Sequence, residues 1–176
     1  MKGSFRYAKA KVINMTQNTG KRLLTGIFVL LSVLLTCFVF GNSLLDGKSS
    51  MAESDVIVDA ARPIVDPERD VSYEDFSSFI RKLAHFAEFC ALGFAYGGTM
   101  RMLSARTPSV HWRYHIGSVF FCILLAAVAD EYIQSFTDRS SMVSDVLLDF
   151  CGGMMGVGIV MVCFALAGWR SAKRNP

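Results

Sequence analysis

The sequence predicts an all-α integral membrane protein with four transmembrane helices. Of its 176 residues, 52% are hydrophobic and 19% are charged, whereas about 25% of residues are charged in typical soluble proteins. Four apolar segments, residues 23–40, 83–100, 116–136 and 143–169, are each long enough to cross a hydrocarbon core of about 30 Å. Because these segments leave no room for a soluble domain of ordinary size, residues 23–169 are expected to form one membrane domain.

The first apolar segment follows a basic N-terminus, residues 1–22. Secretory signal peptides share this order, but their apolar run is usually only about 7–15 residues long. Residues 23–40 exceed that length, and no A-x-A-like cleavage site follows Phe40. We therefore expect this segment to be retained as a transmembrane helix.

The distribution of charge predicts the orientation of the four helices. Lys and Arg are concentrated in residues 1–22, in the loop 101–113 and in the tail 170–176, and none of these regions contains Asp or Glu. Basic residues accumulate in the cytoplasmic loops of membrane proteins. Both termini and the loop 101–113 are therefore predicted to be cytoplasmic. These basic regions lie apart and have no nucleic-acid-binding fold around them, so no nucleic-acid partner is expected.

The long loop after the first span, residues 41–80, is predicted to be extracytoplasmic and to contain short helical segments. Ser50 and Glu53 have the spacing of a capping box, in which the serine and the acid satisfy free N–H groups at a helix start. A short helix is therefore expected to begin near Ser50 and to end before Pro63, since proline interrupts the helical hydrogen bonds.

A second helix start lies at the end of this loop. Ser72 can accept hydrogen bonds from the first free N–H groups, and Asp75 can reach back to Ser72 from the third helical position. The resulting helix is expected to begin outside the membrane and to run unbroken to about Met102, so that it includes the second span.

The third and fourth spans differ in how they accommodate polar residues. The apolar run 116–129 would give a helix of roughly 21 Å, so the third span must continue through Asp130 and Glu131 to reach the other side. In the fourth span, Gly152-x-x-x-Gly156 predicts close packing against another helix.

With this topology, polar side chains of three helices lie at one depth, near the extracytoplasmic surface. Carboxylates inside transmembrane segments cost a few kcal/mol each on insertion scales, so they are rarely kept without a partner or a function. The residues at this depth are His85 and Glu88 in the second helix, Asp130, Glu131 and Gln134 in the third, Arg139 in the following connection, and Asp145 and Asp149 in the fourth.

The joint spacing of these residues resembles the VanZ-like family of bacterial membrane proteins. The matching motifs are Arg81-Lys82-x-x-His85-Phe86-x-Glu88-Phe89-x-x-Leu92-Gly93, Asp130-Glu131-x-x-Gln134-x-Phe136-x-x-Arg139, Asp145-x-x-x-Asp149, Gly152-x-x-x-Gly156 and, more weakly, Phe40-x-x-Ser43. Asp138 departs from the family, which usually has a small residue before the arginine. The resemblance implies a multi-pass protein of the bacterial cytoplasmic membrane, linked to low-level resistance to the glycopeptide teicoplanin, and it implies no molecular activity.

One interpretation of the polar residues is purely structural. Arg81, Lys82 and Arg139 would then neutralise Asp130, Glu131 or Asp145 and hold the bundle in register. A histidine at the position of His85 would serve as a hydrogen-bonded structural residue.

The interpretation favoured by the sequence is recognition of a membrane lipid or a lipid-linked cell-wall intermediate. Arginine suits phosphate because its planar guanidinium offers paired donors. The residues expected to bind the ligand are Arg81, Lys82, Glu88, Asp130, Gln134, Arg139, Asp145 and Asp149. The alternative is a membrane enzyme, a hydrolase or transferase in which His85 and Glu131 share general acid–base work on such a lipid, although no Ser or Cys nucleophile motif accompanies them.

Metal binding and transport are less well supported by the sequence. His85, Glu88, Asp130, Glu131 and Asp149 include only one histidine and have no closed ligand spacing, so neither a metal site nor a cofactor is predicted. Four helices without an internal repeat also lack the architecture of most secondary transporters. The oligomeric state is not predicted.

Overall fold

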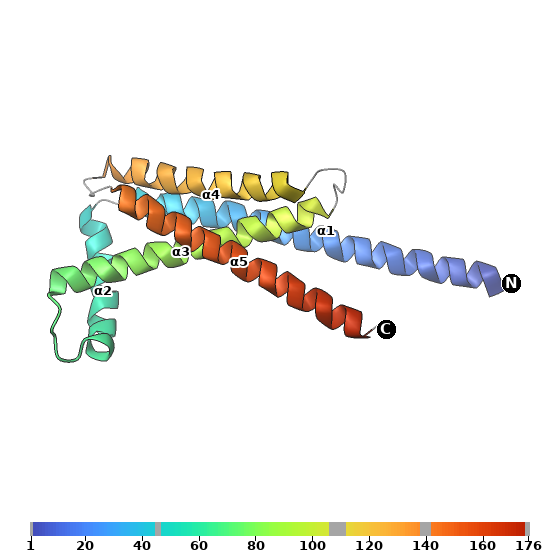
Figure 1. Cartoon of the computed structure of the whole chain (residues 1–176), viewed down its shortest axis with the longest axis horizontal. Helices are drawn as coiled ribbons and strands as arrows, with labels where there is room; N and C mark the ends of the chain where they lie inside the picture. Colours follow the sequence, from blue (N-terminus) through green and yellow to red (C-terminus); the bar gives the residue numbers. More distant parts are fainter. Residues whose placement is uncertain (1, 45–46, 106–111, 138–141, 175–176) are drawn as a thin grey trace.

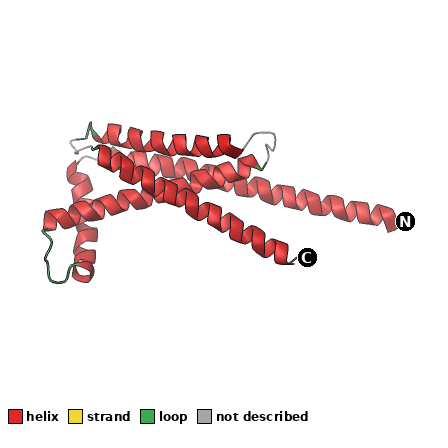
Figure 2. Cartoon of the chain, in the orientation of Figure 1, coloured by secondary structure: helices red, strands yellow, loops and turns green. Residues whose placement is uncertain are grey.

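The computed structural model describes residues 2–44, 47–105, 112–137 and 142–174. Within them the chain forms five α-helices and no strand (Figure 2). The helices are α1 (Lys2–Ser43), α2 (Gly47–Val65), α3 (Tyr73–Ser104), α4 (Trp112–Gln134) and α5 (Val143–Arg174). The all-α prediction is therefore confirmed for the described part of the chain.

Four of the helices run side by side and alternate in direction (Figure 1). The described ends of the chain, the C-terminal end of α3 and the N-terminal end of α4 lie on one side of this bundle. At the opposite end α2 lies across the bundle and packs against α3 (Figure 1). The C-terminal ends of α1 and α4 and the N-terminal ends of α3 and α5 therefore meet near α2.

Three of the helices are long and apolar enough to cross a membrane, namely Thr19–Ser43, His115–Gln134 and Val143–Ser171. This composition identifies a membrane protein. The sequence predicted a fourth span within α3, but α3 does not reach the same mean hydropathy over the described residues. Polar residues in its N-terminal half lower the value. They are tolerated because α3 is the central helix and packs against each of the other four.

Glycines bring the backbones of α3 and α5 into close contact. A Cβ atom added to Gly152 would lie 2.5 Å from the carbonyl oxygen of Phe86, and one added to Gly156 would lie 2.7 Å from the backbone nitrogen of Phe94. Only glycine permits such an approach. The prediction of close packing at Gly152 and Gly156 is therefore confirmed, and this contact fixes α5 against the polar half of α3.

The expected start of α3 is confirmed. The Ser72 hydroxyl accepts a hydrogen bond from the backbone N–H of Asp75 over 3.1 Å and donates one to the Asp75 carboxylate over 2.7 Å. This reciprocal cap defines where the helix begins. The helix then continues to Ser104, two residues beyond the predicted end.

The prediction for the outer helix was wrong at both ends. The helix α2 begins at Gly47, three residues before Ser50, and continues past Pro63 to Val65. Pro63 removes one N–H donor, but it lies in the last turn, and the backbone N–H of Asp66 still bonds the carbonyl of Arg62 over 2.9 Å. A proline this close to the helix end therefore does not stop the helix.

Candidate functional site

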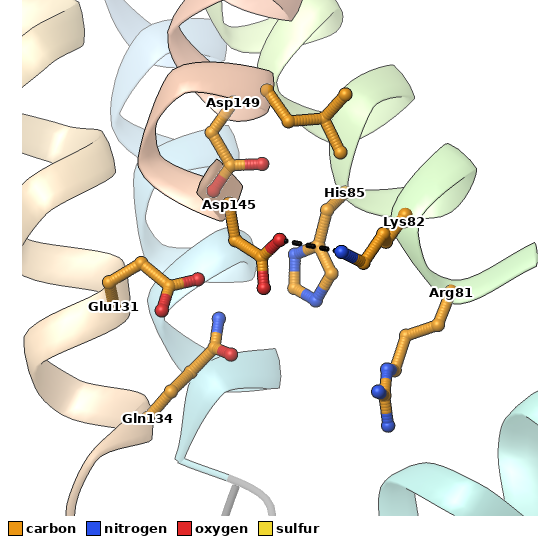
Figure 3. A pocket seen from close by; sticks show the side chains of 8 residues that line it. Arg81, Lys82, His85, Glu131, Gln134, Asp145 and Asp149 are labelled. Atoms are coloured by element: carbon orange, nitrogen blue, oxygen red, sulfur yellow. Dashed lines mark ion pairs between the residues drawn. The ribbon is translucent and has the colours of Figure 1, made fainter. Parts of the chain in front are cut away.

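Polar side chains from four helices gather at the end of the bundle beside α2, and we call this group the polar cluster. Figure 3 shows its members from α3, α4 and α5 that line a pocket. The members of the polar cluster are Asn42 and Ser43 of α1, Arg81, Lys82, His85 and Glu88 of α3, Asp130, Glu131 and Gln134 of α4, and Asp145 and Asp149 of α5. The structure thus brings together every candidate that the sequence placed at one depth, apart from Arg139, which lies outside the described residues, as does Asp138.

Asp130 is the best-anchored acid of the polar cluster and is fully buried, with 0% exposure. One carboxylate oxygen, Oδ1, accepts a hydrogen bond from the Ser43 hydroxyl. The other, Oδ2, accepts a hydrogen bond from Gln134 Nε2 over 2.6 Å, one helical turn further along α4. A buried carboxylate is tolerated when donors surround it, so these contacts hold Asp130 in one orientation.

Asp149 differs from Asp130 although it is buried to the same degree, with 1% exposure. Its Oδ1 atom is enclosed and has no hydrogen-bond partner among the described residues. His85, Asp130 and Asp149 each offer one nitrogen or oxygen atom, and these three atoms all lie within 4.8 Å of one another. In Figure 3 the Asp149 carboxylate points toward the region occupied by the His85 ring.

The remaining acids each have a defined contact. Glu88 Oε1 accepts a hydrogen bond from Asn42 Nδ2 over 3.0 Å, and Glu88 Oε2 lies 4.0 Å from His85 Nδ1. Glu131 Oε2 accepts a hydrogen bond from the backbone N–H of Met142 over 3.1 Å, just before α5 begins. Glu131, which the sequence put forward as an acid–base residue, thus also joins α4 to the start of α5.

The two cations next to His85 behave differently. Lys82 Nζ forms an ion pair with Asp145 Oδ1 over 2.9 Å, and its side chain remains 39% exposed. Arg81 is partly exposed and forms no ion pair with any acidic residue in the described part of the chain. Its guanidinium points away from the acids (Figure 3). Lys82 therefore has the acidic partner that structural neutralisation requires, whereas Arg81 has none among the described residues.

A pocket opens among these side chains between α3, α4 and α5. It is lined by Arg81, Lys82, His85, Glu131, Gln134, Asp145, Leu148 and Asp149. The partly exposed residues lie at its mouth, whereas Glu131, Gln134 and Asp149 are buried. Its volume is about 30 Å³, far below the roughly 300–1,000 Å³ of pockets that enclose drug-sized ligands. The pocket therefore has room for small groups such as water or an ion, and a larger ligand would contact only its mouth.

The contribution of α1 to the polar cluster was largely missed from the sequence. The motif Phe40-x-x-Ser43 drew attention to Ser43 but gave it no role, and Asn42 was not considered. Both residues lie where the apolar run of α1 ends. Their amide and hydroxyl side chains are at the same predicted depth as the acids of the other helices, and this shared depth could have predicted that they belong to the cluster.

Chemically, the polar cluster combines one imidazole, several carboxylates and two cations. It can exchange protons, hold a cation among its oxygen atoms or attract an anion at its mouth. The hydroxyl group closest to the acids, that of Ser43, is fully buried and donates to Asp130. It is therefore poorly placed to serve as a nucleophile for a substrate that enters from the pocket mouth.

The comparisons with known proteins agree with this architecture. No significant match is found among curated proteins or among solved structures. A family model described as VanZ/LLP1 matches residues 28–164, which is more than half of the chain and includes every residue of the polar cluster. The chain therefore belongs to the VanZ/LLP1 family.

Proposed function

We propose that the protein crosses the bacterial cytoplasmic membrane four times, with both termini in the cytoplasm and the polar cluster at the extracytoplasmic side. Three apolar helices support a membrane location, and α3 is the proposed fourth span because its polar residues are covered by its neighbours. The basic regions at one end of the bundle support the orientation, since such residues favour the cytoplasm.

Reporter fusions test this topology. Fusions at Thr107 and at the C-terminus are expected to read cytoplasmic, and a fusion near Val65 is expected to read external. An external reading at Thr107 would overturn the orientation and, with it, the proposal that the pocket faces the cell wall.

We further propose that the mouth of the pocket binds the anionic headgroup of a membrane lipid or of a lipid-linked cell-wall intermediate. The observation that carries this proposal is Arg81, a partly exposed cation at the mouth that has no acidic partner among the described residues. A guanidinium can bind two phosphate oxygens at once. Lys82 lies beside it and is exposed enough to contribute a second positive charge.

Membership of the VanZ/LLP1 family supports a link to glycopeptide tolerance of the teicoplanin type. A protein that binds a lipid-linked cell-wall intermediate at the outer surface would act on the compartment in which glycopeptides meet their targets. The size of the pocket supports recognition of the headgroup alone, because a volume of about 30 Å³ does not enclose a whole lipid.

The replacement of Arg81 by Gln tests this recognition. Arg81→Gln is expected to reduce both the anionic lipid that copurifies in mild detergent and the teicoplanin tolerance of cells that depend on the protein. Arg101→Gln is the matched control, since Arg101 lies on the same helix near its other end and contacts the Phe164 ring. Unchanged lipid and unchanged tolerance in a folded Arg81→Gln protein would contradict the proposal.

A second candidate function is a membrane-embedded hydrolase or transferase with His85 and Glu131 as acid–base residues. The proximity of His85 to Asp130 and Asp149 favours it, because a carboxylate beside an imidazole can orient the ring and support proton transfer. Recognition is preferred because the described residues that line the pocket include no serine, threonine or cysteine to serve as a hydroxyl or thiol nucleophile.

A further inference from the structure

A buried carboxylate, that of Asp149, lines the pocket, and one of its two oxygen atoms has no hydrogen-bond partner among the described residues. This atom is Oδ1, and Asp149 is 1% exposed. Transfer of an unpaired carboxylate out of water is costly, so such a group usually holds a proton or lies next to a cation. Of the two cations in the pocket lining, Lys82 is already paired with Asp145, and the guanidinium of Arg81 points away from the acids (Figure 3).

The atoms around Asp149 have the separation that a bound metal ion requires. One donor atom each from His85, Asp130 and Asp149 lies within 4.8 Å of the other two. Ligand atoms about 2.0–2.2 Å from a metal ion lie roughly 3–4.4 Å apart. Shifts of a few tenths of an ångström would therefore bring the three donors around one ion. The sequence argued against a metal because the candidate ligands include only one histidine and have no closed spacing along the chain. Folding removes the second objection, since the three donors come together in space.

The groups behind these donors are the kind that support metal ligands. Ser43 and Gln134 fix the orientation of the Asp130 carboxylate by hydrogen bonds, as supporting groups do for the carboxylates that bind metals. The Glu88 carboxylate lies 4.0 Å from Nδ1 of His85, and metal-binding histidines commonly place their other ring nitrogen near a carboxylate.

We propose that His85, Asp130 and Asp149 bind one divalent transition-metal ion, Mn²⁺ or Zn²⁺, at the base of the pocket. One imidazole and two carboxylates combine the nitrogen donor that Zn²⁺ accepts readily with the oxygen donors that Mn²⁺ prefers. Three protein ligands leave positions open toward the pocket, where a volume of about 30 Å³ admits water. The site does not depend on the proposed lipid recognition, because Arg81 is not among its ligands.

Metal binding by the purified full chain in detergent tests the proposal. The protein is stripped with a chelator, dialysed against Mn²⁺ or Zn²⁺ at micromolar concentration and analysed for metal content. The expected result is one ion per chain, with the tighter of the two ions identified by competition. Asp149→Asn and His85→Gln are expected to weaken binding at least tenfold. Asp59→Asn is expected to keep the wild-type affinity, because Asp59 is an exposed acid of α2 that accepts a hydrogen bond from Tyr73 and lies outside the lining of this pocket.

Two outcomes would overturn the proposal. The first is a folded wild-type protein that binds neither ion in stoichiometric amount, which would mean that Asp149 holds a proton instead. The second is unchanged affinity in both ligand variants. If the variants fail to fold, the wild-type protein still decides the question, since Mn²⁺ bound to His85 must show a ¹⁴N coupling in its pulsed electron paramagnetic resonance spectrum, and its absence would exclude this site.

Discussion

The hydroxyl of Ser43, the last residue of α1, donates a hydrogen bond to Oδ1 of Asp130 near the end of α4. Both residues are fully buried, and 87 positions separate them in the sequence. The bond therefore joins the first and fourth helices at the depth of the polar cluster. It also makes the orientation of Asp130 depend on α1, a helix that contributes no residue to the pocket lining.

Removal of this hydroxyl is expected to destabilise the protein. Ser43→Ala leaves a buried carboxylate with one donor fewer, which costs about 1–3 kcal/mol, so the midpoint of thermal unfolding in detergent should fall. Ser135→Ala is the matched control, because the exposed Ser135 hydroxyl bonds only the nearby Tyr132 carbonyl. Equal unfolding midpoints for the two variants would show that the Ser43–Asp130 bond contributes little.

The contact between α3 and α5 gives a second prediction. A Cβ atom at Gly156 would overlap the backbone of Cys90 and Phe94, whereas nothing lies within 4 Å of a Cβ atom at Gly158. Gly156→Ala is therefore expected to lower stability by about 1–3 kcal/mol through overpacking. Gly158→Ala should leave stability unchanged or raise it slightly, since alanine favours the helix. Thermal unfolding of both variants in detergent compares them directly, and a Gly156→Ala protein as stable as Gly158→Ala would contradict the close contact.

Hydropathy and capping residues predicted most of the fold, because both act locally. The spans that became α1, α4 and α5 and the Ser72 cap of α3 follow from residues next to one another in the sequence. The extent of α2 does not follow from neighbouring residues in this way. A proline such as Pro63 predicts a helix end, but whether it ends the helix depends on how close it lies to the last turn. The central position of α3, a more polar helix that contacts each of the other four, depends on how the helices pack and not on neighbouring residues in the sequence.

The residues of the candidate site were predicted better than their partners. A carboxylate in an apolar segment is conspicuous, and this is why Asp130, Glu131 and Asp149 stood out. The donor that each acid contacts depends on the rotation of the helices about their axes and on displacements smaller than 1 Å. The spacing of residues along the chain fixes neither. The sequence therefore could not show that Ser43 bonds Asp130 or that Oδ1 of Asp149 has no described hydrogen-bond partner.

The ion pair between Lys82 and Asp145 allows a structural role to be separated from ligand binding. The pair is partly exposed, so its coupling energy in a double-mutant cycle with Lys82→Met and Asp145→Asn should be only about 0.2–1 kcal/mol. Thermal unfolding of the two single variants and the double variant measures this coupling. If Lys82 serves only to neutralise Asp145, the double variant should regain both stability and teicoplanin tolerance.

A different outcome is expected if Lys82 contacts an anionic ligand. The double variant would then be as stable as the wild-type protein and would still lack tolerance and copurifying anionic lipid. A double variant with full tolerance would show that Lys82 is not needed to bind the anionic ligand, and Arg81 would remain as the cation that binds it at the pocket mouth.

Variants of His85 separate recognition, catalysis and metal binding. A general base must exchange a proton with its substrate, and imidazole does so near neutral pH because its unperturbed pKa is about 6.5. His85→Gln and His85→Asn keep some hydrogen bonding but cannot transfer a proton in this way. A folded Gln variant with full teicoplanin tolerance would exclude His85 as a general base, which agrees with recognition at the mouth of the pocket.

The metal content of the same variants gives the remaining distinction. If His85 is a metal ligand, the Gln and Asn variants should lose teicoplanin tolerance and the bound ion together. The variant with the weaker metal affinity should then also have the lower tolerance. If His85 is a general base, function should be lost while metal content stays at the wild-type level. His85→Ala serves as the reference in both measurements, because it removes the ring, which is partly buried in the pocket wall, and thermal unfolding shows which variants remain folded enough to be compared.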